Sequence, residues 1–309
     1  MQSKILPPPL QPGDLLRVIA PSGALREFEA FDRSVEIWRS RGYRVEIMPK
    51  LADKWGYLAE KDEFRRQQLT TAWSDPDCRG ILCTRGGFGS TRILENWTWE
   101  LNSAPPKWLI GFSDITALLW SLYTAGVCSV HAPVLTTLAD ETDWSIERLF
   151  NFLEGRSIPP LIGCGWGGGI ATGLLLPGNL TVTTHLLATS IIPQLDNIIL
   201  AWEDVTEVPY RIDRMLTQWR LSGVLSKVSG IALGSFTKCE APPNVPSFSV
   251  EEVLRDRLGD LGIPIVSDLP FGHDSPNAAL PVGVVATLDA DRGVLSCRGG
   301  LNNMLVNSQ

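Results

Sequence analysis

The sequence lacks several features that mark metal-binding and nucleic-acid-binding proteins. Its six cysteines include no Cys-x-x-Cys pair, which argues against a structural zinc site. The net charge of −7 and the pI near 5.1 argue against a nucleic-acid partner, because a phosphate backbone favours a basic surface. Histidine is also scarce. Only three are present, so the search for a catalytic base is short.

An apolar leader and long apolar runs are missing as well. The first residues, MQSKILPPPLQPGD, contain three consecutive prolines and no apolar stretch of the length that a signal peptide needs. The most apolar later stretch, around 108–135, is interrupted by Asp114 and His131. No span approaches the ~20 apolar residues of a membrane helix. We therefore expect a cytoplasmic protein with no membrane partner, and a chain of this length without a leader should not depend on disulfides.

What remains is ordinary globular composition, with 44% hydrophobic and 20% charged residues. The 309 residues suit two domains at roughly 100–200 residues each. The first half alternates apolar runs with segments of helical spacing, which predicts a parallel sheet covered by helices. The predicted strands are 16–22, 43–49, 80–87, 108–112 and 127–133, and the predicted helices begin at 28, 61 and 114.

A helix at 145–154 is predicted to close the first domain, residues 1–155. The segment 156–169 is rich in glycine and proline and is the predicted linker. Residues 170–309 are the predicted second domain. Its expected strands are 197–203, 230–236, 264–270 and a pair within 278–298, with helices around 210–220 and 249–261.

Ser113 is the sharpest chemical feature of the sequence. It stands in Gly111-Phe112-Ser113-Asp114, between an apolar strand and a helix. A helix start offers free N–H groups and partial positive charge, so the N–H of Asp114 could stabilise the oxyanion of an attacked carbonyl. The pattern departs from G-x-S-x-G, because Ile115 takes the place of the second glycine. The alternative is that Ser113 or Asp114 only caps the helix.

A glycine-rich segment, Arg85-Gly86-Gly87-Phe88-Gly89, follows another predicted strand. Glycines at a strand end let the backbone approach a ligand and expose N–H groups. This segment could therefore supply a second oxyanion donor, or it could be a plain turn. A phosphate-binding P-loop is excluded, because no Lys-Ser/Thr pair follows.

The three histidines differ in their sequence context. His185 falls within a predicted helix and is expected to be packed or on the surface. His131 ends a strand and could lie near the site or only be hydrogen-bonded there. His273 lies in a loop after a strand, where catalytic groups collect.

Glu203 ends an apolar strand, so its carboxylate must be paired or hydrogen-bonded. It could orient a histidine and stabilise the imidazolium. The alternative is a salt bridge to Arg211 or Arg214. Asp204 and Asp274 are competing candidates for the orienting carboxylate.

Two further patterns predict no cofactor and no metal. The glycines at 163–168 match G-x-G-x-x-G but lack the strand and helix that dinucleotide binding requires. Asp140, Glu141 and Asp143, with His131, could suggest a metal. Acidic residues in a loop more often form a solvated face.

Seven segments, in order, resemble the LD-carboxypeptidase family of serine peptidases, which includes murein tetrapeptide carboxypeptidases and microcin-C-immunity proteins. They cover nearly the whole chain, and it is their combination and order that make the resemblance specific. The segments are 7–23, 56–69, 84–90, 110–119, 177–182, 201–216 and 269–273.

The resemblance implies a catalytic triad of Ser113, Glu203 and His273. It also implies an oxyanion hole formed by the backbone N–H groups of Asp114 and of a glycine in the Arg-Gly-Gly segment, for which we favour Gly87. The implied fold is α/β, with an N-terminal parallel-sheet α/β domain and a C-terminal β-rich α+β domain. The active site is expected in the cleft between them, and homodimers are common.

The implied activity is hydrolysis of the L,D-peptide bond before a terminal D-amino acid of murein tetrapeptides during cell-wall recycling, without metal or cofactor. Arg85 is a candidate cation for the free carboxylate of that residue. Many relatives have His-Gly-Pro where this chain has His131-Ala132-Pro133, which leaves the substrate open in detail. The alternatives are a peptidase of the microcin-C-immunity type, acting on a peptidyl- or aminoacyl-nucleotide, and a non-catalytic two-domain binding protein. A nicotinamide dehydrogenase is disfavoured by the missing fingerprint.

Overall fold

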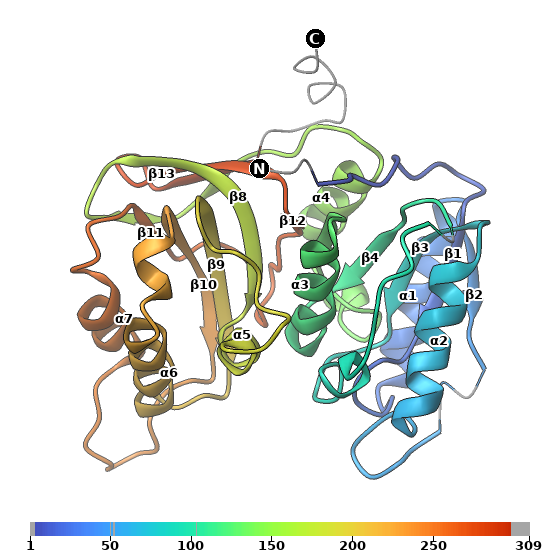
Figure 1. Ribbon diagram of the computed structural model, residues 1–309, viewed down its shortest axis with the longest axis horizontal. Helices are drawn as coiled ribbons and strands as arrows, with labels where there is room; N and C mark the ends of the chain where they lie inside the picture. The colour runs from blue at the N-terminus through green and yellow to red at the C-terminus, as the bar shows by residue number, and fades with distance from the viewer. Residues whose placement is uncertain (1–3, 50, 52, 103, 298–309) are drawn as a thin grey trace.

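The computed structural model describes residues 4–49, 51, 53–102 and 104–297. Two halves lie side by side, each built on one sheet (Figure 1). In the described part of the chain, no helix combines the length and the apolar character needed to cross a bilayer.

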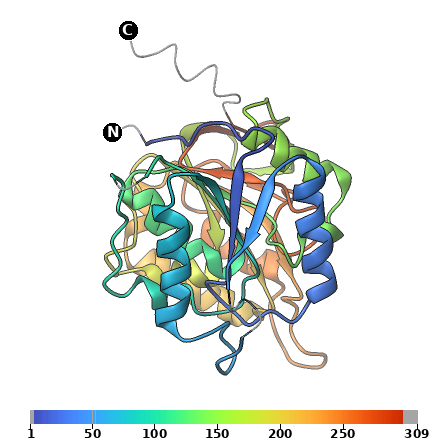
Figure 2. The ribbon, with the colours of Figure 1, turned by 90° about the vertical axis from the view of Figure 1, so that its right-hand side faces the viewer.

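Within the described residues, six strands form the first sheet, in the order β12-β5-β4-β3-β1-β2. The five strands from the first half pair in parallel, and β12 runs antiparallel to β5. Figure 2 shows α1 and α2 on opposite sides of the sheet edge made by β1 and β2. The predicted parallel α/β fold of this half is therefore confirmed. Its elements are β1 (Leu15–Ile19), α1 (Phe28–Ser40), β2 (Arg44–Ile47), α2 (Asp62–Ser74), β3 (Cys78–Cys83), η1 (Arg92–Leu94), β4 (Trp108–Gly111), η2 (Ser113–Ile115), α3 (Thr116–Ala125), β5 (Ser129–His131), η3 (Leu138–Asp140) and α4 (Asp143–Leu153).

Eight of the described strands form the second sheet, in the order β6-β14-β13-β8-β9-β10-β11-β7. Strands β8 to β11 pair in parallel and the remaining pairs are antiparallel, so this half is mixed and β-rich, as predicted. The elements are β6 (Leu161–Ile162), β7 (Cys164–Trp166), β8 (Ile170–Asn179), α5 (Leu180–Leu186), β9 (Ile198–Val205), α6 (Pro209–Leu221), η4 (Val224–Lys227), β10 (Gly230–Thr237), α7 (Val250–Leu258), β11 (Ile265–Ser267), β12 (Leu280–Val282), β13 (Val285–Asp289) and β14 (Val294–Cys297).

The segment 156–169 is not a bare linker, because β6 and β7 add to two edges of the second sheet. Its glycines permit this close packing. A Cβ at Gly163 would lie 2.1 Å from the Ser267 carbonyl oxygen, and one at Gly165 would lie 1.8 Å from that of Ala290. The strand β12, from the predicted second domain, pairs instead with the first sheet. A domain division near 156–169 stays a proposal, with β12 exchanged into the first half.

Local sequence signals explain several element ends. Ser249 accepts a hydrogen bond from the Glu252 N–H while the Glu252 carboxylate accepts one from the Ser249 N–H, a capping box that starts α7. Proline at the first position starts α6. At the end of α3, Gly126 has φ +108°, a left-handed conformation that favours glycine.

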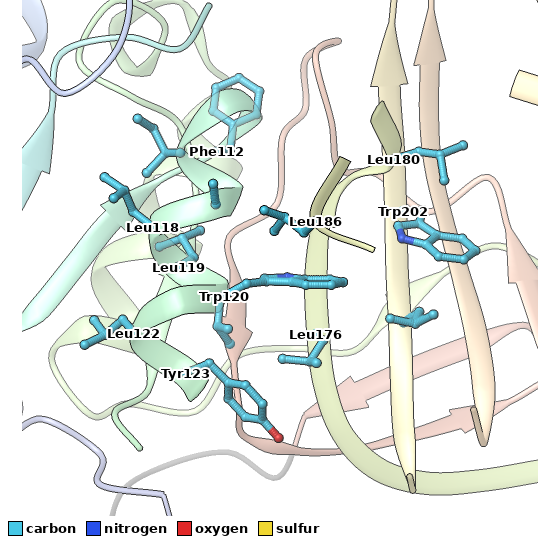
Figure 3. Packing of buried hydrophobic residues seen from close by; sticks show 14 of the residues in the cluster. Phe112, Leu118, Leu119, Trp120, Leu122, Tyr123, Leu176, Leu180, Leu186 and Trp202 are labelled. Carbon is cyan, nitrogen blue, oxygen red and sulfur yellow. The ribbon is translucent and has the colours of Figure 1, made fainter. Parts of the chain in front are cut away.

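The two halves share one hydrophobic core across α3 (Figure 3). Leu119 and Trp120 of α3 pack in the same cluster as Leu176 and Trp202 of the second sheet. Trp120 is fully buried, and its Nε1 donates a hydrogen bond to the Pro177 carbonyl oxygen at 2.8 Å. This shared core fixes the position of one sheet relative to the other.

Replacing Trp120 by alanine should lower the free energy of unfolding by about 3–5 kcal/mol, because removing the buried ring would leave a cavity between the halves. Chemical denaturation monitored by circular dichroism measures the change. Trp144, whose exposed fraction is 39%, is the matched control, and Trp144→Ala should change stability little. Equal effects of the two substitutions would contradict a shared core that depends on Trp120.

Candidate active site

Ser113 lies where β4 ends and η2 begins, ahead of α3. Its φ is +62°, a left-handed conformation that is uncommon outside glycine. Such strain persists only where the surrounding structure enforces it, and it concentrates at functional sites. The strained turn from strand to helix is the arrangement that presents a nucleophilic hydroxyl at the C-terminal end of a strand.

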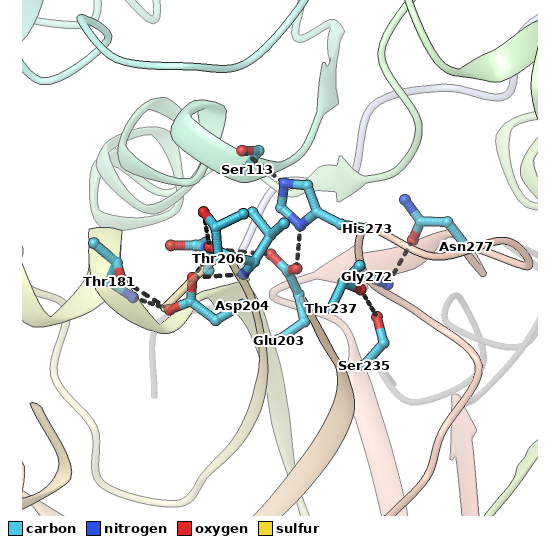
Figure 4. A network of polar contacts seen from close by, with 12 residues as sticks. Ser113, Thr181, Glu203, Asp204, Thr206, Ser235, Thr237, Gly272, His273 and Asn277 are labelled. Atoms are coloured by element: carbon cyan, nitrogen blue, oxygen red, sulfur yellow. Dashed lines mark hydrogen bonds and ion pairs between the residues drawn. The ribbon is translucent and has the colours of Figure 1, made fainter. Parts of the chain in front are cut away.

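His273 brings together Ser113 and Glu203, which come from different sheets (Figure 4). Its Nε2 lies 3.1 Å from Ser113 Oγ, and its Nδ1 lies 2.6 Å from Glu203 Oε2. Both separations fall in the range of about 2.6–3.2 Å expected for a nucleophile, a base and an orienting group. Glu203 lies in β9 and is fully buried, while the His273 side chain is 18% exposed.

Gly272 lets the loop after β11 carry His273 into this position. Its φ is +128°, and a Cβ there would lie 2.3 Å from Ser235 Oγ and 3.1 Å from Glu203 Cβ. Only glycine fits such an approach without displacing a neighbour. The Gly272 N–H donates to Asn277 Oδ1 at 3.0 Å, which fixes the loop on its other side.

Glu141, from the first half, fastens the same loop. Its Oε2 accepts hydrogen bonds from the Ser275 hydroxyl at 3.0 Å and from the Asn277 N–H at 2.9 Å. The interpretation of Glu141 as part of a solvated acidic face is therefore wrong. Its partners lie more than 130 residues away in sequence, so no local pattern indicated them.

Glu203, rather than Asp204 or Asp274, contacts the His273 ring. Asn179 Nδ2 donates to Glu203 Oε1 at 3.3 Å and to Asp204 Oδ1 at 3.1 Å, so one amide group bridges the two carboxylates. Asp204 Oδ2 accepts from the N–H and the hydroxyl of Thr181, both at 2.8 Å. Asp204 therefore supports the site from behind. The sequence indicated Asn179 only as part of the 177–182 segment.

The alternative salt bridge from Glu203 to an arginine is not what the structure shows. Arg211 pairs with Glu207 at 3.5 Å, and Arg214 lies over the Tyr210 ring. The buried Glu203 carboxylate is instead balanced by His273 and Asn179.

The charges around His273 raise its pKa. Burial alone would lower the pKa of the imidazole, but the Glu203 carboxylate outweighs burial through its charge and its hydrogen bond, with help from Asp204 and Asp274. Burial, together with the neighbouring Glu203 charge, raises the pKa of Asp204 to about 6. The site thus favours an imidazolium beside Glu203.

The other two histidines do not contact Ser113. His185 is exposed in the last turn of α5. His131 is fully buried between the rings of Phe112 and Phe271, and neither of its ring nitrogens has a hydrogen-bond partner among the described residues. Burial lowers the pKa of His131 to about 4, so the ring is neutral at neutral pH.

Two backbone N–H groups face no protein acceptor beside Ser113. Among the described residues, neither the Gly87 N–H nor the Asp114 N–H donates a hydrogen bond. A Cβ at Gly86 would lie 2.8 Å from Ser113 Cβ and 2.9 Å from its Oγ, so the glycine segment passes directly beside the serine. Gly87 itself has φ +114°.

A small pocket of about 210 Å³ opens over these groups. Arg85 reaches it from the glycine segment, and its Nη1 donates to the Ala24 carbonyl oxygen at 2.9 Å and to Glu27 Oε2 at 3.2 Å. The Arg85 guanidinium and the Glu27 carboxylate thus form an ion pair at the pocket wall. The pocket is lined by Glu27, Arg85, Gly86, Gly87, Phe112, Ser113, Val134, Thr136, Thr137 and His273.

The described residues hold no group of three or more His, Cys, Asp or Glu that could bind a metal ion. The glycines at 163–168 lie in and around the edge strands β6 and β7 and are followed by the strand β8, so no helix start is present to receive a pyrophosphate.

Comparison with known protein families identifies the family of this chain. Residues 16–132 match the LD-carboxypeptidase N-terminal domain, and residues 172–288 match the LD-carboxypeptidase C-terminal domain. The chain belongs to the LD-carboxypeptidase family. The predicted resemblance is confirmed, and the chain is a hydrolase of a serine-type carboxypeptidase family.

Relatives cover almost the whole chain. A provisionally named carboxypeptidase of Synechocystis sp. is 59% identical over 94% of this chain and 96% of its own. The murein tetrapeptide carboxypeptidase of Pseudomonas aeruginosa is 31% identical over 89% and 93%. The microcin C7 self-immunity protein MccF of Escherichia coli is 27% identical over 94% and 95%. The crystal structure of muramoyltetrapeptide carboxypeptidase from Oxalobacter formigenes has a TM-score of 0.81 at 28% identity, over 92% of this chain and 97% of that one.

For an enzyme that uses His273 as its base, kcat/KM should rise with pH. The protonated ring cannot accept a proton from Ser113, and the raised pKa of His273 puts the midpoint above the ordinary value of an imidazole. Glu203→Gln removes the charge that stabilises the imidazolium, so the midpoint should move to lower pH while the rate falls about 10²–10⁴-fold. A pH–rate profile of both proteins measures this. An unchanged midpoint in the variant would contradict the electrostatic role of Glu203.

Proposed function

We propose that the protein is a serine carboxypeptidase that hydrolyses the L,D-peptide bond before a terminal D-amino acid, as in the tetrapeptides of murein. The observation that carries the proposal is the His273 ring, which lies within hydrogen-bonding distance of both Ser113 Oγ and the Glu203 carboxylate. Membership of the family and the names of its murein-peptide relatives support the choice of substrate.

In the proposed reaction, Ser113 Oγ attacks the scissile carbonyl carbon while its proton passes to His273 Nε2. The neutral ring must then carry its own proton on Nδ1, directed at Glu203 Oε2 2.6 Å away. The buried Glu203 carboxylate stabilises the imidazolium that forms. The imidazolium next donates its Nε2 proton to the leaving amine, which releases the D-amino acid.

The negative charge that develops on the attacked oxygen needs donors that are already in place. We propose the backbone N–H groups of Gly87 and Asp114, both without a protein acceptor among the described residues. Removing one such donor lowers the rate of comparable enzymes about 10²–10³-fold. Water then attacks the acyl-enzyme with His273 as base, and Ser113 is regenerated.

Arg85 is the proposed partner of the substrate's free carboxylate. It lines the pocket over Ser113, and Glu27 holds one of its terminal nitrogens from the side. A guanidinium that lines the same pocket as the serine suits a substrate whose free carboxylate lies close to the scissile bond. We further propose that the protein forms a homodimer, that the substrate enters through the cleft between the halves, and that the protein is cytoplasmic.

The second candidate function is that of the microcin-immunity branch, cleavage of a peptidyl- or aminoacyl-nucleotide. The similarity to MccF over 94% of this chain favours it. The higher identity to the murein tetrapeptide carboxypeptidase favours the first candidate. Assaying an L,D-tetrapeptide and an aminoacyl sulfamoyl adenosine side by side separates the two.

Ser113→Ala should abolish release of D-alanine from a murein tetrapeptide, because no other described side chain offers a nucleophile within reach of His273 Nε2. Chromatography of the released amino acid measures the rate. His185→Ala, at an exposed site, is the control and should keep the wild-type rate. Release by Ser113→Ala at the wild-type rate would sink the proposal.

Arg85→Met should raise KM for a tetrapeptide with a free C-terminal carboxylate by about 10-fold or more, since a charge-assisted hydrogen bond is lost. The same peptide with a C-terminal amide should be cleaved poorly by the wild type and no worse by the variant. Steady-state kinetics on the two peptides check this. An equal loss on both peptides would show that Arg85 supports the fold instead of the carboxylate.

A further inference from the structure

Two loops meet directly behind the proposed oxyanion hole. One follows β1 and contains Ser22 and Gly23, and the other follows β3 and contains Gly86 and Ser90. The Gly23 N–H donates to the Gly86 carbonyl oxygen at 3.2 Å, so the loops touch beside Ser113. Neither segment lies within a named helix or strand, although the first also bonds to the backbone of residues 57–59 through the Ser22 carbonyl oxygen and the Ala24 N–H.

The side chain of Asp114 joins both loops. Its Oδ2 accepts a hydrogen bond from the Ser22 hydroxyl at 2.6 Å and another from the Ser90 N–H at 2.8 Å. The Ser90 hydroxyl in turn donates to the Asp114 carbonyl oxygen. Asp114 is 3% exposed and both serines are fully buried, so water does not compete for these bonds.

Arg65 of α2 joins the same two loops one residue earlier in each. Its guanidinium donates to the carbonyl oxygens of Pro21 and Gly89, the latter at 2.8 Å. Its other bonds go to the Glu60 carbonyl oxygen at 3.1 Å and to Asp62 Oδ1 at 2.6 Å. The Arg65 side chain is fully buried, and its bonds to Pro21 and Gly89 are made away from solvent, whereas Asp62 is partly exposed.

The two charged groups thus bind the loops in complementary ways. The Asp114 carboxylate takes donors from both loops, and the Arg65 guanidinium gives donors to carbonyls of both loops. Hydrogen bonds to ionised groups are roughly twice as strong as neutral ones, which suits a role in holding a strained turn. The same backbone carries Ser113 at φ +62° and Gly87 at φ +114°.

We propose that Asp114 and Arg65 are positioning residues that hold the Gly86–Gly87 backbone and the Ser113 turn in the geometry of the oxyanion hole. The inference rests on the proposed function. It assigns the Asp114 side chain a task separate from that of its own N–H. None of the bonds involved reaches His273 or Glu203, so their loss should leave the proton-transfer chain in place.

The test compares a transition-state analogue with a product. A tripeptide ending in boronic acid at the position of the scissile carbonyl forms a tetrahedral adduct, in which boron accepts a lone pair of Ser113 Oγ and the serine proton passes to His273. The tripeptide product needs no oxyanion hole. In Asp114→Ala, boronate affinity should fall about 30-fold or more while product affinity stays within about 3-fold.

Three further variants serve as tests and controls for this interpretation. Asp114→Asn keeps the shape and one acceptor, and Arg65→Lys keeps the charge with a shorter reach, so both should show the same selective loss at smaller size. Asp75→Ala is the matched control. Asp75 accepts from Arg17 Nε at 2.7 Å and from the Asp77 N–H at 2.9 Å just before β3 begins, at the sheet edge opposite Ser113. Asp75→Ala should lower the melting temperature of the protein without changing the ratio of boronate affinity to product affinity.

A ratio of boronate to product affinity that is unchanged in Asp114→Ala and Asp114→Asn would overturn the inference, as would the same selective loss in Asp75→Ala. If Asp114→Ala does not fold, the ratio in Asp114→Asn and Arg65→Lys decides. Failure of the proposed function is a different result, in which the wild type neither cleaves the L,D-peptide nor binds the boronate. The rate of Ser113 acylation by p-nitrophenyl acetate, which needs no peptide site, then tests the same variants.

Discussion

One imidazole joins the two halves of this protein. His273, carried by the second half, lies 3.1 Å from the Ser113 hydroxyl of the first and 2.6 Å from the Glu203 carboxylate of β9. A hydrogen-bonded chain of this kind tolerates little relative movement of the sheets. The shared core around Trp120, the return of β12 to the first sheet and the bonds from Glu141 to the His273 loop all restrict that movement. Much of the architecture serves this one alignment.

The charges of the site are arranged in layers. Glu203 contacts the ring, Asn179 bridges Glu203 and Asp204, and Asp204 accepts a hydrogen bond from Thr181. On the serine side, Asp114 and Arg65 hold the backbone instead of the reacting atoms. Buried charges are costly unless they are hydrogen-bonded, and each of these is. The proposed proton-transfer groups and the proposed oxyanion donors are therefore supported by separate polar networks.

Local patterns in the sequence were enough to predict the five parallel strands of the first sheet, because apolar runs and helical spacing alternate there, and to place Ser113 at a strand–helix junction. They did not predict β6, β7 or the pairing of β12, since these short strands depend on partners far away in the chain. For the same reason Glu141 and the Asp114 side chain went unrecognised. The pairing of Ser113, Glu203 and His273 came from the family resemblance, because the residues alone left Asp204 and Asp274 open as alternatives.

The tautomer of His273 tests the account most directly, because a ring that serves as base to Ser113 must keep its own proton on Nδ1, toward Glu203. The chain has three histidines, so a protein labelled with ¹⁵N-histidine gives three sets of imidazole signals. A pH titration should distinguish the buried His131, whose pKa is lowered, from His273, whose pKa is raised. We predict that neutral His273 is protonated on Nδ1 and unprotonated on Nε2. A proton held on Nε2 in the neutral ring would contradict the proposed chain from Glu203 to Ser113.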